Sequence, residues 1–223
     1  MNTIVPTRLL FDFEFSLAYR AKPPAIDGSL DGWTDAERLP LLGELDGGAD
    51  FAEVWACWNE DGLFFACSVE DKRRPLRCNP AEFWRGDNIR LCTDMRDARS
   101  NKRATRTCQQ FFLLPTGGGS EREDAIAGIN KFRRAREDAP PVDASQIRIA
   151  SDIGGTDYCL EAHIPRSCLS GFDPEEHGRI GFYYIIEDRD WGQQYLTVGD
   201  EYQWFIDPST WATAVLAPKK APG

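Results

Sequence analysis

The sequence predicts an all-β protein: a single-domain antiparallel β-sandwich of the jelly-roll kind, with long loops, covering residues 1–223. Three observations support this fold class. One segment alternates strictly between apolar and polar residues, two apolar segments flank an Asp-Gly turn, and many further short apolar segments are separated by turn residues. Such a succession of short strands is typical of a sandwich, and the chain is long enough to bury a substantial core.

The clearest strand is Phe11–Tyr19, in which large apolar side chains occupy every second position. This alternation places one face of the strand against the core and the other in water. The next two strands, Glu53–Trp58 and Leu63–Val69, are predicted to form a hairpin, because Asp61-Gly62 between them favours a tight turn.

Further strands are predicted along the rest of the chain. They are Asn88–Thr93, Gln109–Leu114, Ile147–Ala150, Tyr158–Ile164, Ile180–Ile186 and Ala212–Ala217. Pro115 and the glycines that follow it are expected to end the second of these. The segment Glu121–Ala139 is ambiguous, because some of its apolar residues have helical spacing but Gly128 interrupts them. We expect a connection there, with a short strand or a helical turn.

Composition narrows the range of functions. The 36 acidic residues outnumber the 26 basic ones, which argues against a dedicated nucleic-acid-binding protein. No apolar run approaches the roughly 20 residues that span a membrane, so no membrane partner is expected. The N-terminus lacks the basic start and apolar core of a signal peptide, which predicts a cytoplasmic protein if the chain is complete. The seven cysteines form no C-x-x-C pair and are expected to be mainly buried free thiols.

Four segments, taken in order, resemble a known family. Ala25–Trp33 reads A-I-D-G-S-L-D-G-W, Val54–Asp71 reads V-W-A-C-W-N-E-D-G-L-F-F-A-C-S-V-E-D, Phe83–Asp94 reads F-W-R-G-D-N-I-R-L-C-T-D, and Tyr158–Pro165 reads Y-C-L-E-A-H-I-P. The set resembles a family 9 carbohydrate-binding module, one branch of the sandwich domains that bind sugar or haem. The resemblance runs from about Ala25 to Leu216. It implies non-catalytic sugar binding through an aromatic clamp, linked to carbohydrate catabolism as an accessory to glycoside hydrolases.

Trp84 is the best candidate for one wall of such a clamp. A flat indole matches the C–H face of a pyranose ring in shape and in charge distribution. The alternative is a tryptophan at the edge of the core. The resemblance implies a second aromatic wall in the C-terminal part, where we favour Trp204 and place Trp191 second, with Trp211 structural. Three further tryptophans are expected in the core: Trp33, Trp55 and Trp58.

Polar residues after Trp84 could contact the sugar. Asp87 and Asn88 could exchange hydrogen bonds with hydroxyl groups, or could simply cap the strand. Arg90 stands where relatives carry a glutamate that contacts the sugar, and arginine binds carboxylate and sulfate groups. This departure predicts that the protein binds acidic glycans. The basic runs Lys72–Arg77 and Arg96–Arg106 would form a cationic rim if their loops fold over the site, and are otherwise a solvated surface.

Other functional classes have less support. No catalytic residue is predicted, because the sequence contains no nucleophile elbow, phosphate loop or metal-binding helix. No cofactor is expected, although Asp188 and Asp190 resemble an acidic loop of the family, some of whose members bind calcium; no complete set of oxygen ligands is found. One alternative is a haem b electron-transfer domain with Met95 and His163 as iron ligands, although both are more simply structural. Another is a domain without sugar binding that acts through a protein partner.

Overall fold

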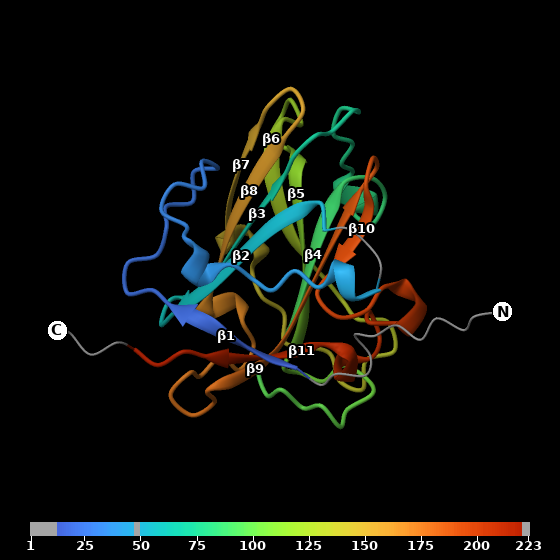
Figure 1. Ribbon diagram of the computed structural model, residues 1–223. Coiled ribbons are helices and arrows are strands. Elements are labelled where there is room, and N and C mark those ends of the chain that lie inside the picture. Colours follow the sequence, from blue (N-terminus) through green and yellow to red (C-terminus); the bar gives the residue numbers. More distant parts are fainter. Residues whose placement is uncertain (1–12, 47–49, 220–223) are drawn as a thin grey trace.

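The computed structural model describes residues 13–46 and 50–219, which contain β-strands and short 3-10 helices but no α-helix (Figure 1). The strands are β1 (Glu14–Tyr19), β2 (Ala52–Asn59), β3 (Gly62–Val69), β4 (Asn88–Asp94), β5 (Cys108–Gly118), β6 (Asp124–Asn130), β7 (Arg148–Ile153), β8 (Tyr158–Pro165), β9 (Arg179–Asp188), β10 (Gly192–Tyr195) and β11 (Ala212–Leu216). The 3-10 helices are η2 (Asp35–Glu37), η3 (Gly43–Asp46), η4 (Pro80–Glu82), η5 (Ala144–Gln146), η6 (Arg166–Cys168), η7 (Asp200–Tyr202) and η8 (Pro208–Thr210).

The strands form one continuous, mostly closed, barrel-like sheet. Their order is β6-β5-β4-β9-β11-β1-β2-β3-β8-β7, with β10 paired to β9, and the two ends of this order, β6 and β7, contact each other. The all-β prediction is confirmed, whereas the two-sheet sandwich and jelly-roll details are not. β1 joins the halves of the sheet, because it pairs in parallel with β11 on one side and with β2 on the other.

The alternation predicted for the first strand is present from residue 13 onward. Leu17 is fully buried, and Phe13, Phe15 and Tyr19 pack against the core. Ser16, on the opposite face, is exposed, as the period of two requires. Phe11 and Asp12 lie outside the described residues.

The predicted hairpin of β2 and β3 is confirmed, with Asn59 paired to Gly62 at its turn. The prediction that a strand ends before Pro115 is wrong. β5 continues to Gly118 through a register shift that begins after Leu114, and proline is tolerated at such bulges because a ladder hydrogen bond is already missing there. The ambiguous segment contains a regular strand, β6, which pairs along β5.

A buried carboxylate explains two of the sequence motifs. Glu161 on β8 accepts hydrogen bonds from the backbone amides of Asp27 (2.9 Å) and Gly28 (2.6 Å), and from the indole nitrogen of Trp33 (2.7 Å). Gly28 is needed because its φ is +90° and a Cβ would collide with Ser151. The I-D-G…W motif therefore fixes the N-terminal loop to the core.

The cysteines of the structure are free, and most of them are buried. Burial raises the pKa of Cys57 to about 12 and that of Cys108 to about 11. Both thiols are therefore protonated at neutral pH and pack as small apolar groups.

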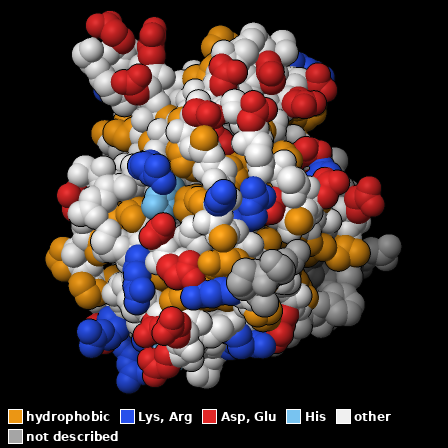
Figure 2. All heavy atoms as spheres, turned by 90° about the vertical axis from the view of Figure 1, so that its left-hand side faces the viewer, with side chains coloured by type: hydrophobic (Ala, Val, Ile, Leu, Met, Phe, Trp, Pro, Cys, Tyr) orange, Lys and Arg blue, Asp and Glu red, His pale blue; other side chains and the backbone are white. Residues whose placement is uncertain are grey.

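The face shown in Figure 2 mixes acidic and basic side chains, and acidic ones gather along its upper edge. In the part of the chain that is described, no helix is both long and apolar enough to span a bilayer.

Candidate carbohydrate-binding site

The loop before β4 holds Trp84 at the surface. Its ends are joined by two hydrogen bonds between Arg77 and Asp87, one from each backbone amide: to the Asp87 carboxylate (2.7 Å) and to the Arg77 carbonyl (3.0 Å). Gly86 has a φ of +91°, and a side chain there would collide with the Arg77 carbonyl. Asn79 caps η4 through its side chain. The closed loop leaves the Trp84 side chain 50% exposed.

Stacked aromatic rings support Trp84 from below. Phe83 is buried and meets the indole edge to face, with ring centroids 5.2 Å apart. Phe83 itself stacks on Phe112 of β5, at 4.5 Å and an interplanar angle of 9°. Gly128 on β6 makes room for this stack, since a Cβ there would collide with the Phe112 ring. Trp84 is thus an exposed aromatic surface on a rigid support.

Trp84 forms one wall of a groove, here called the Trp84 groove, with a volume of about 450 Å³. This volume lies within the roughly 300–1,000 Å³ of small-molecule sites. The lining residues are Phe83, Trp84, Arg90, Gln110, Asn130, Lys131, Arg133, Asp200 and Phe205. They come from the β4, β5 and β6 region and from the segment around η7, so residues far apart in the sequence meet here.

Arg90 on β4 lies in the groove with its charge partly neutralised. Its Nη2 is 2.6 Å from a carboxylate oxygen of Glu187 on β9, and its guanidinium lies 4.8 Å from the ring centre of Trp204. Its buried Nε has no hydrogen-bond partner among the described residues. Arg90 is therefore held in position by the ion pair and the indole ring, while its Nε keeps an unused donor.

Trp204 does not form the second wall, contrary to our expectation. It is 0% exposed, stacks on Tyr183 at 4.9 Å, and donates its indole N–H to Asp200 (2.9 Å). Its carbonyl accepts from Trp211, which is also buried, as expected for a structural residue. The next residue, Phe205, lines the groove instead. Irregular backbone has no side-chain period, so the sequence Y-Q-W-F could not show which ring faces inward.

Trp191 lies apart from the groove. Its side chain is 41% exposed, in the turn between β9 and β10. Its indole nitrogen donates to the carbonyl of Glu70 (3.1 Å), and the Arg73 guanidinium lies 5.8 Å from the ring centre. The structure therefore does not bring Trp191 and Trp84 together.

Asp87 and Asn88 are fully buried and do not line the groove. Asn88 donates to a carboxylate oxygen of Glu187 (2.9 Å), and Asp87 accepts from the Lys72 ammonium (3.1 Å). Their positions fit the structural alternative, in which both residues organise the start of β4.

Lys72 is surrounded by acidic side chains rather than exposed on a basic rim. Its Nζ lies 3.1 Å from Asp87, 2.5 Å from Asp188 and 3.8 Å from Asp190. Burial would lower the pKa of Lys72, but its hydrogen bonds to Asp188 and Asp87 outweigh burial and raise it. Within the described ranges, no group of three or more His, Cys, Asp or Glu side chains is placed to hold a metal ion.

The other predicted cations lie elsewhere as well. No residue of the Lys72–Arg77 or Arg96–Arg106 runs lines the Trp84 groove. The basic residues that do line it, besides Arg90, are Lys131 and Arg133. The sequence predicts a connection with a short strand or a helical turn for their segment, and its basic residues are a signal of the groove that was not used.

The haem alternative gains no support from its proposed ligands. Met95 is buried in the core. His163 stacks on Phe64 at 4.4 Å, its Nδ1 contacts Arg148 (3.1 Å), and its Nε2 lies 3.3 Å from the carbonyl of Asp61. Both imidazole nitrogens are therefore already engaged.

No protein-family model matches the chain, and no curated protein matches it significantly. Solved structures do match. A family 9 carbohydrate-binding module from Caldicellulosiruptor kristjanssonii in complex with glucose has a TM-score of 0.66, 14% identity, and coverage of 94% of this chain and 98% of the module. The module in complex with cellotriose gives a TM-score of 0.65, 14% identity, and coverage of 93% and 95%. A proposed carbohydrate-binding protein from Bacteroides uniformis gives 0.60 and 11%, over 92% and 99%.

These similarities show that the chain has the fold of a carbohydrate-binding module. More particularly, the fold is like that of family 9, as the ordered sequence motifs predicted.

Proposed function

We propose that this protein binds carbohydrate without transforming it, and that the Trp84 groove holds the sugar. One observation carries the proposal. The indole of Trp84 is half exposed, rests on the Phe83 ring, and forms one wall of a groove that hydrogen-bonding side chains also line. Solved structures of similar fold come from proteins bound to glucose and cellotriose, which supports the same class of ligand.

Trp84 and Phe205 are the proposed aromatic clamp. Both line the groove, and the C–H faces of a pyranose pack well on such rings. Gln110, Asn130 and Asp200 line the same groove and offer donors and acceptors for hydroxyl groups.

A tryptophan pair in this chain provides a matched test. Trp84→Ala should abolish binding of the best ligand from a glycan array, because truncating an aromatic hot spot costs about 2 kcal/mol or more. Trp191→Ala removes an indole of similar exposure outside the groove and should leave affinity unchanged. Calorimetric titration measures affinity, and a thermal scan confirms that each variant is folded. Full affinity in Trp84→Ala would contradict the proposal.

We further propose a preference for acidic glycans. Arg90 shares its charge with Glu187, so Lys131 and Arg133 at the groove are the additional cations that would attract a carboxylate or sulfate group. Local groups set the potential of a cleft more than net charge does.

This preference predicts weaker binding of acidic ligands as salt rises, since exposed charges are screened within about 8–10 Å at physiological ionic strength. Arg133→Gln should reduce that salt dependence, whereas Arg134→Gln, which removes a neighbouring charge that does not line the groove, should not. A neutral oligosaccharide that binds as tightly as its acidic counterpart, without salt dependence, would argue for neutral sugars.

A further inference from the structure

Two loops, the second of which contributes Lys131 and Arg133 to the Trp84 groove, carry a concentration of exposed arginines. They are the segments 95–107 and 131–139, and their exposed arginines are Arg96, Arg103, Arg106, Arg133, Arg134 and Arg136. The loops are joined by a backbone hydrogen bond from Arg136 to the carbonyl of Ala104 (2.8 Å). A protein with a formal net charge of −10 thus presents a locally basic surface.

The two loops enclose a hollow of about 660 Å³, here called the arginine hollow, whose walls include Arg96, Arg106 and Arg136. The Arg96 guanidinium is fixed there by the carbonyls of Met95 (2.9 Å) and Gly171 (2.7 Å). Arg106 and Arg136 make no side-chain hydrogen bond or ion pair with the described residues. Their donors therefore face solvent and are available to an anion.

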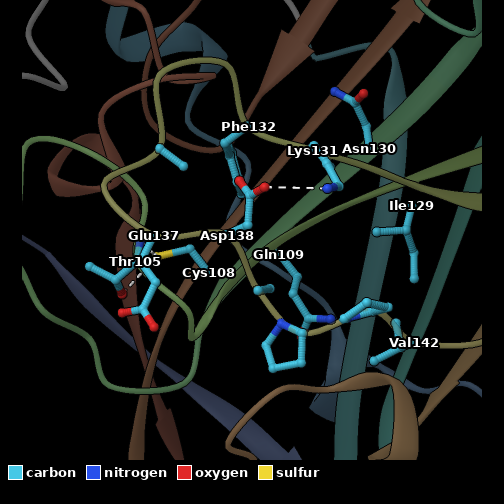
Figure 3. Close-up of a pocket in the computed structure, with 14 residues that line it drawn as sticks. Thr105, Cys108, Gln109, Ile129, Asn130, Lys131, Phe132, Glu137, Asp138 and Val142 are labelled. Atoms are coloured by element: carbon cyan, nitrogen blue, oxygen red, sulfur yellow. Dashed lines mark hydrogen bonds and ion pairs between the residues drawn. The ribbon is translucent and has the colours of Figure 1, made fainter.

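The arginine hollow and the Trp84 groove each share lining residues with a third hollow, which Figure 3 shows. This third hollow shares Thr105 and Glu137 with the arginine hollow, and Asn130 and Lys131 with the Trp84 groove. In Figure 3 a dashed line joins the Lys131 ammonium to Asp138, with which it is paired at 3.3 Å. Residues of the segment 130–137 therefore line all three hollows, with Asn130, Lys131 and Arg133 in the Trp84 groove and Arg136 and Glu137 in the arginine hollow.

We infer that the arginine hollow is a second subsite, which binds a carboxylate or sulfate group of an acidic oligosaccharide whose other end lies in the Trp84 groove. The inference rests on the proposed function. Guanidinium groups bind such anions through paired charge-assisted hydrogen bonds. Two linked subsites favour a long ligand over a short one, because the second contact becomes intramolecular.

The test uses short and long members of one series of uronic-acid oligosaccharides, measured by calorimetry on the whole chain. In the double variant Arg106→Ser/Arg136→Ser, affinity for the long member should fall about tenfold or more, since the charge-assisted hydrogen bonds of both guanidinium groups to the anion are lost. Affinity for the short member should change by less than about twofold. The matched control, Arg122→Ser/Arg166→Ser, removes the same charge outside the three hollows and should affect neither.

Equal losses in the two double variants would overturn the inference, because net charge alone would then explain them. An unchanged affinity for the long member would also overturn it, as would the failure of the wild-type chain to bind any acidic oligosaccharide. Single-stranded DNA bound as tightly as the long glycan would assign the hollow to nucleic acid instead. The proposed function fails separately: it is refuted if Trp84→Ala binds glycans like the wild-type protein, whatever the arginine variants do.

Discussion

Lys72 carries its charge into a buried site, where it joins two loops. Its side chain is only 4% exposed, and it contacts carboxylates from the start of β4 and the end of β9. The same carboxylates accept backbone amides from both loops, including those of Arg77 and Arg189 at Asp87. This one ammonium group therefore holds the loop that carries Trp84 against the β9–β10 turn.

Replacing Lys72 should be strongly destabilising. Lys72→Met keeps the length of the side chain but leaves buried carboxylates without their cation, which costs roughly 3–5 kcal/mol. Arg74→Met is the matched control, because Arg74 pairs with the same Asp190 but is 60% exposed, so its loss should cost about 1 kcal/mol or less. Urea denaturation of both variants measures the difference. Equal losses of stability would show that Lys72 is an ordinary surface ion pair.

The same cluster predicts how stability depends on pH. The pKa of Lys72 is raised above 10.5 in the folded state. Its contribution to the free energy of unfolding is therefore complete below pH 10.5 and is lost as pH rises through the folded-state pKa. Burial would raise the pKa of Asp190, but the amides of Arg73 and Arg74 and the Lys72 charge lower it below 3.8. The contribution of Asp190 to the free energy of unfolding is therefore complete above pH 3.8 and is lost as pH falls through the lowered pKa.

The difference in unfolding free energy between the wild-type protein and Lys72→Met should therefore be constant between about pH 4 and pH 10 and should shrink outside this range. Denaturation across the pH range checks this. A difference that varies steadily through neutral pH would mean that another group governs it.

Among the elements, β6 shows best where sequence reading fails. Its apolar pattern is interrupted by Gly128, which leaves a connection with either a short strand or a helical turn as the expectation. In the structure this glycine is required because the Phe112 ring of the neighbouring strand lies over it. The alternation of β1 and the Asp-Gly turn of β2 and β3 were predictable because they depend on local chemistry. A glycine that makes room for a ring on another strand depends on a partner that the local sequence does not reveal.

Gly128 gives a prediction that links the sheet to the site. Gly128→Ala should displace Phe112, and with it the Phe83 ring on which Trp84 rests, so both stability and sugar affinity should fall. Overpacking of this kind costs about 1–3 kcal/mol. Gly155→Ala adds a methyl group where no atom lies within 4 Å and is the control. Thermal denaturation and calorimetric titration measure the two effects. Unaltered sugar affinity in a destabilised Gly128→Ala would separate the stack from the site.

For the molecule as a whole, the sequence predicted the all-β class and the family 9-like fold, because ordered motifs report buried contacts such as those of Glu161. It did not predict the closed sheet, since strand positions do not reveal which edges meet. Of the residues that line the Trp84 groove, it singled out Trp84 and Arg90 but not Phe205, Lys131 or Arg133. Those three lie in irregular segments, whose side-chain directions are set by tertiary contacts rather than by a repeating pattern.

The parallel pairing of β1 with β11 determines how the protein would resist force. Because the strands run in the same direction, opposite pulls on residue 13 and residue 219 would slide one strand along the other. The four residue pairs from Glu14–Thr213 to Leu17–Leu216 would then share the load and break together, rather than open one at a time. A sheet joined in this way should resist shear between the two ends of the described chain.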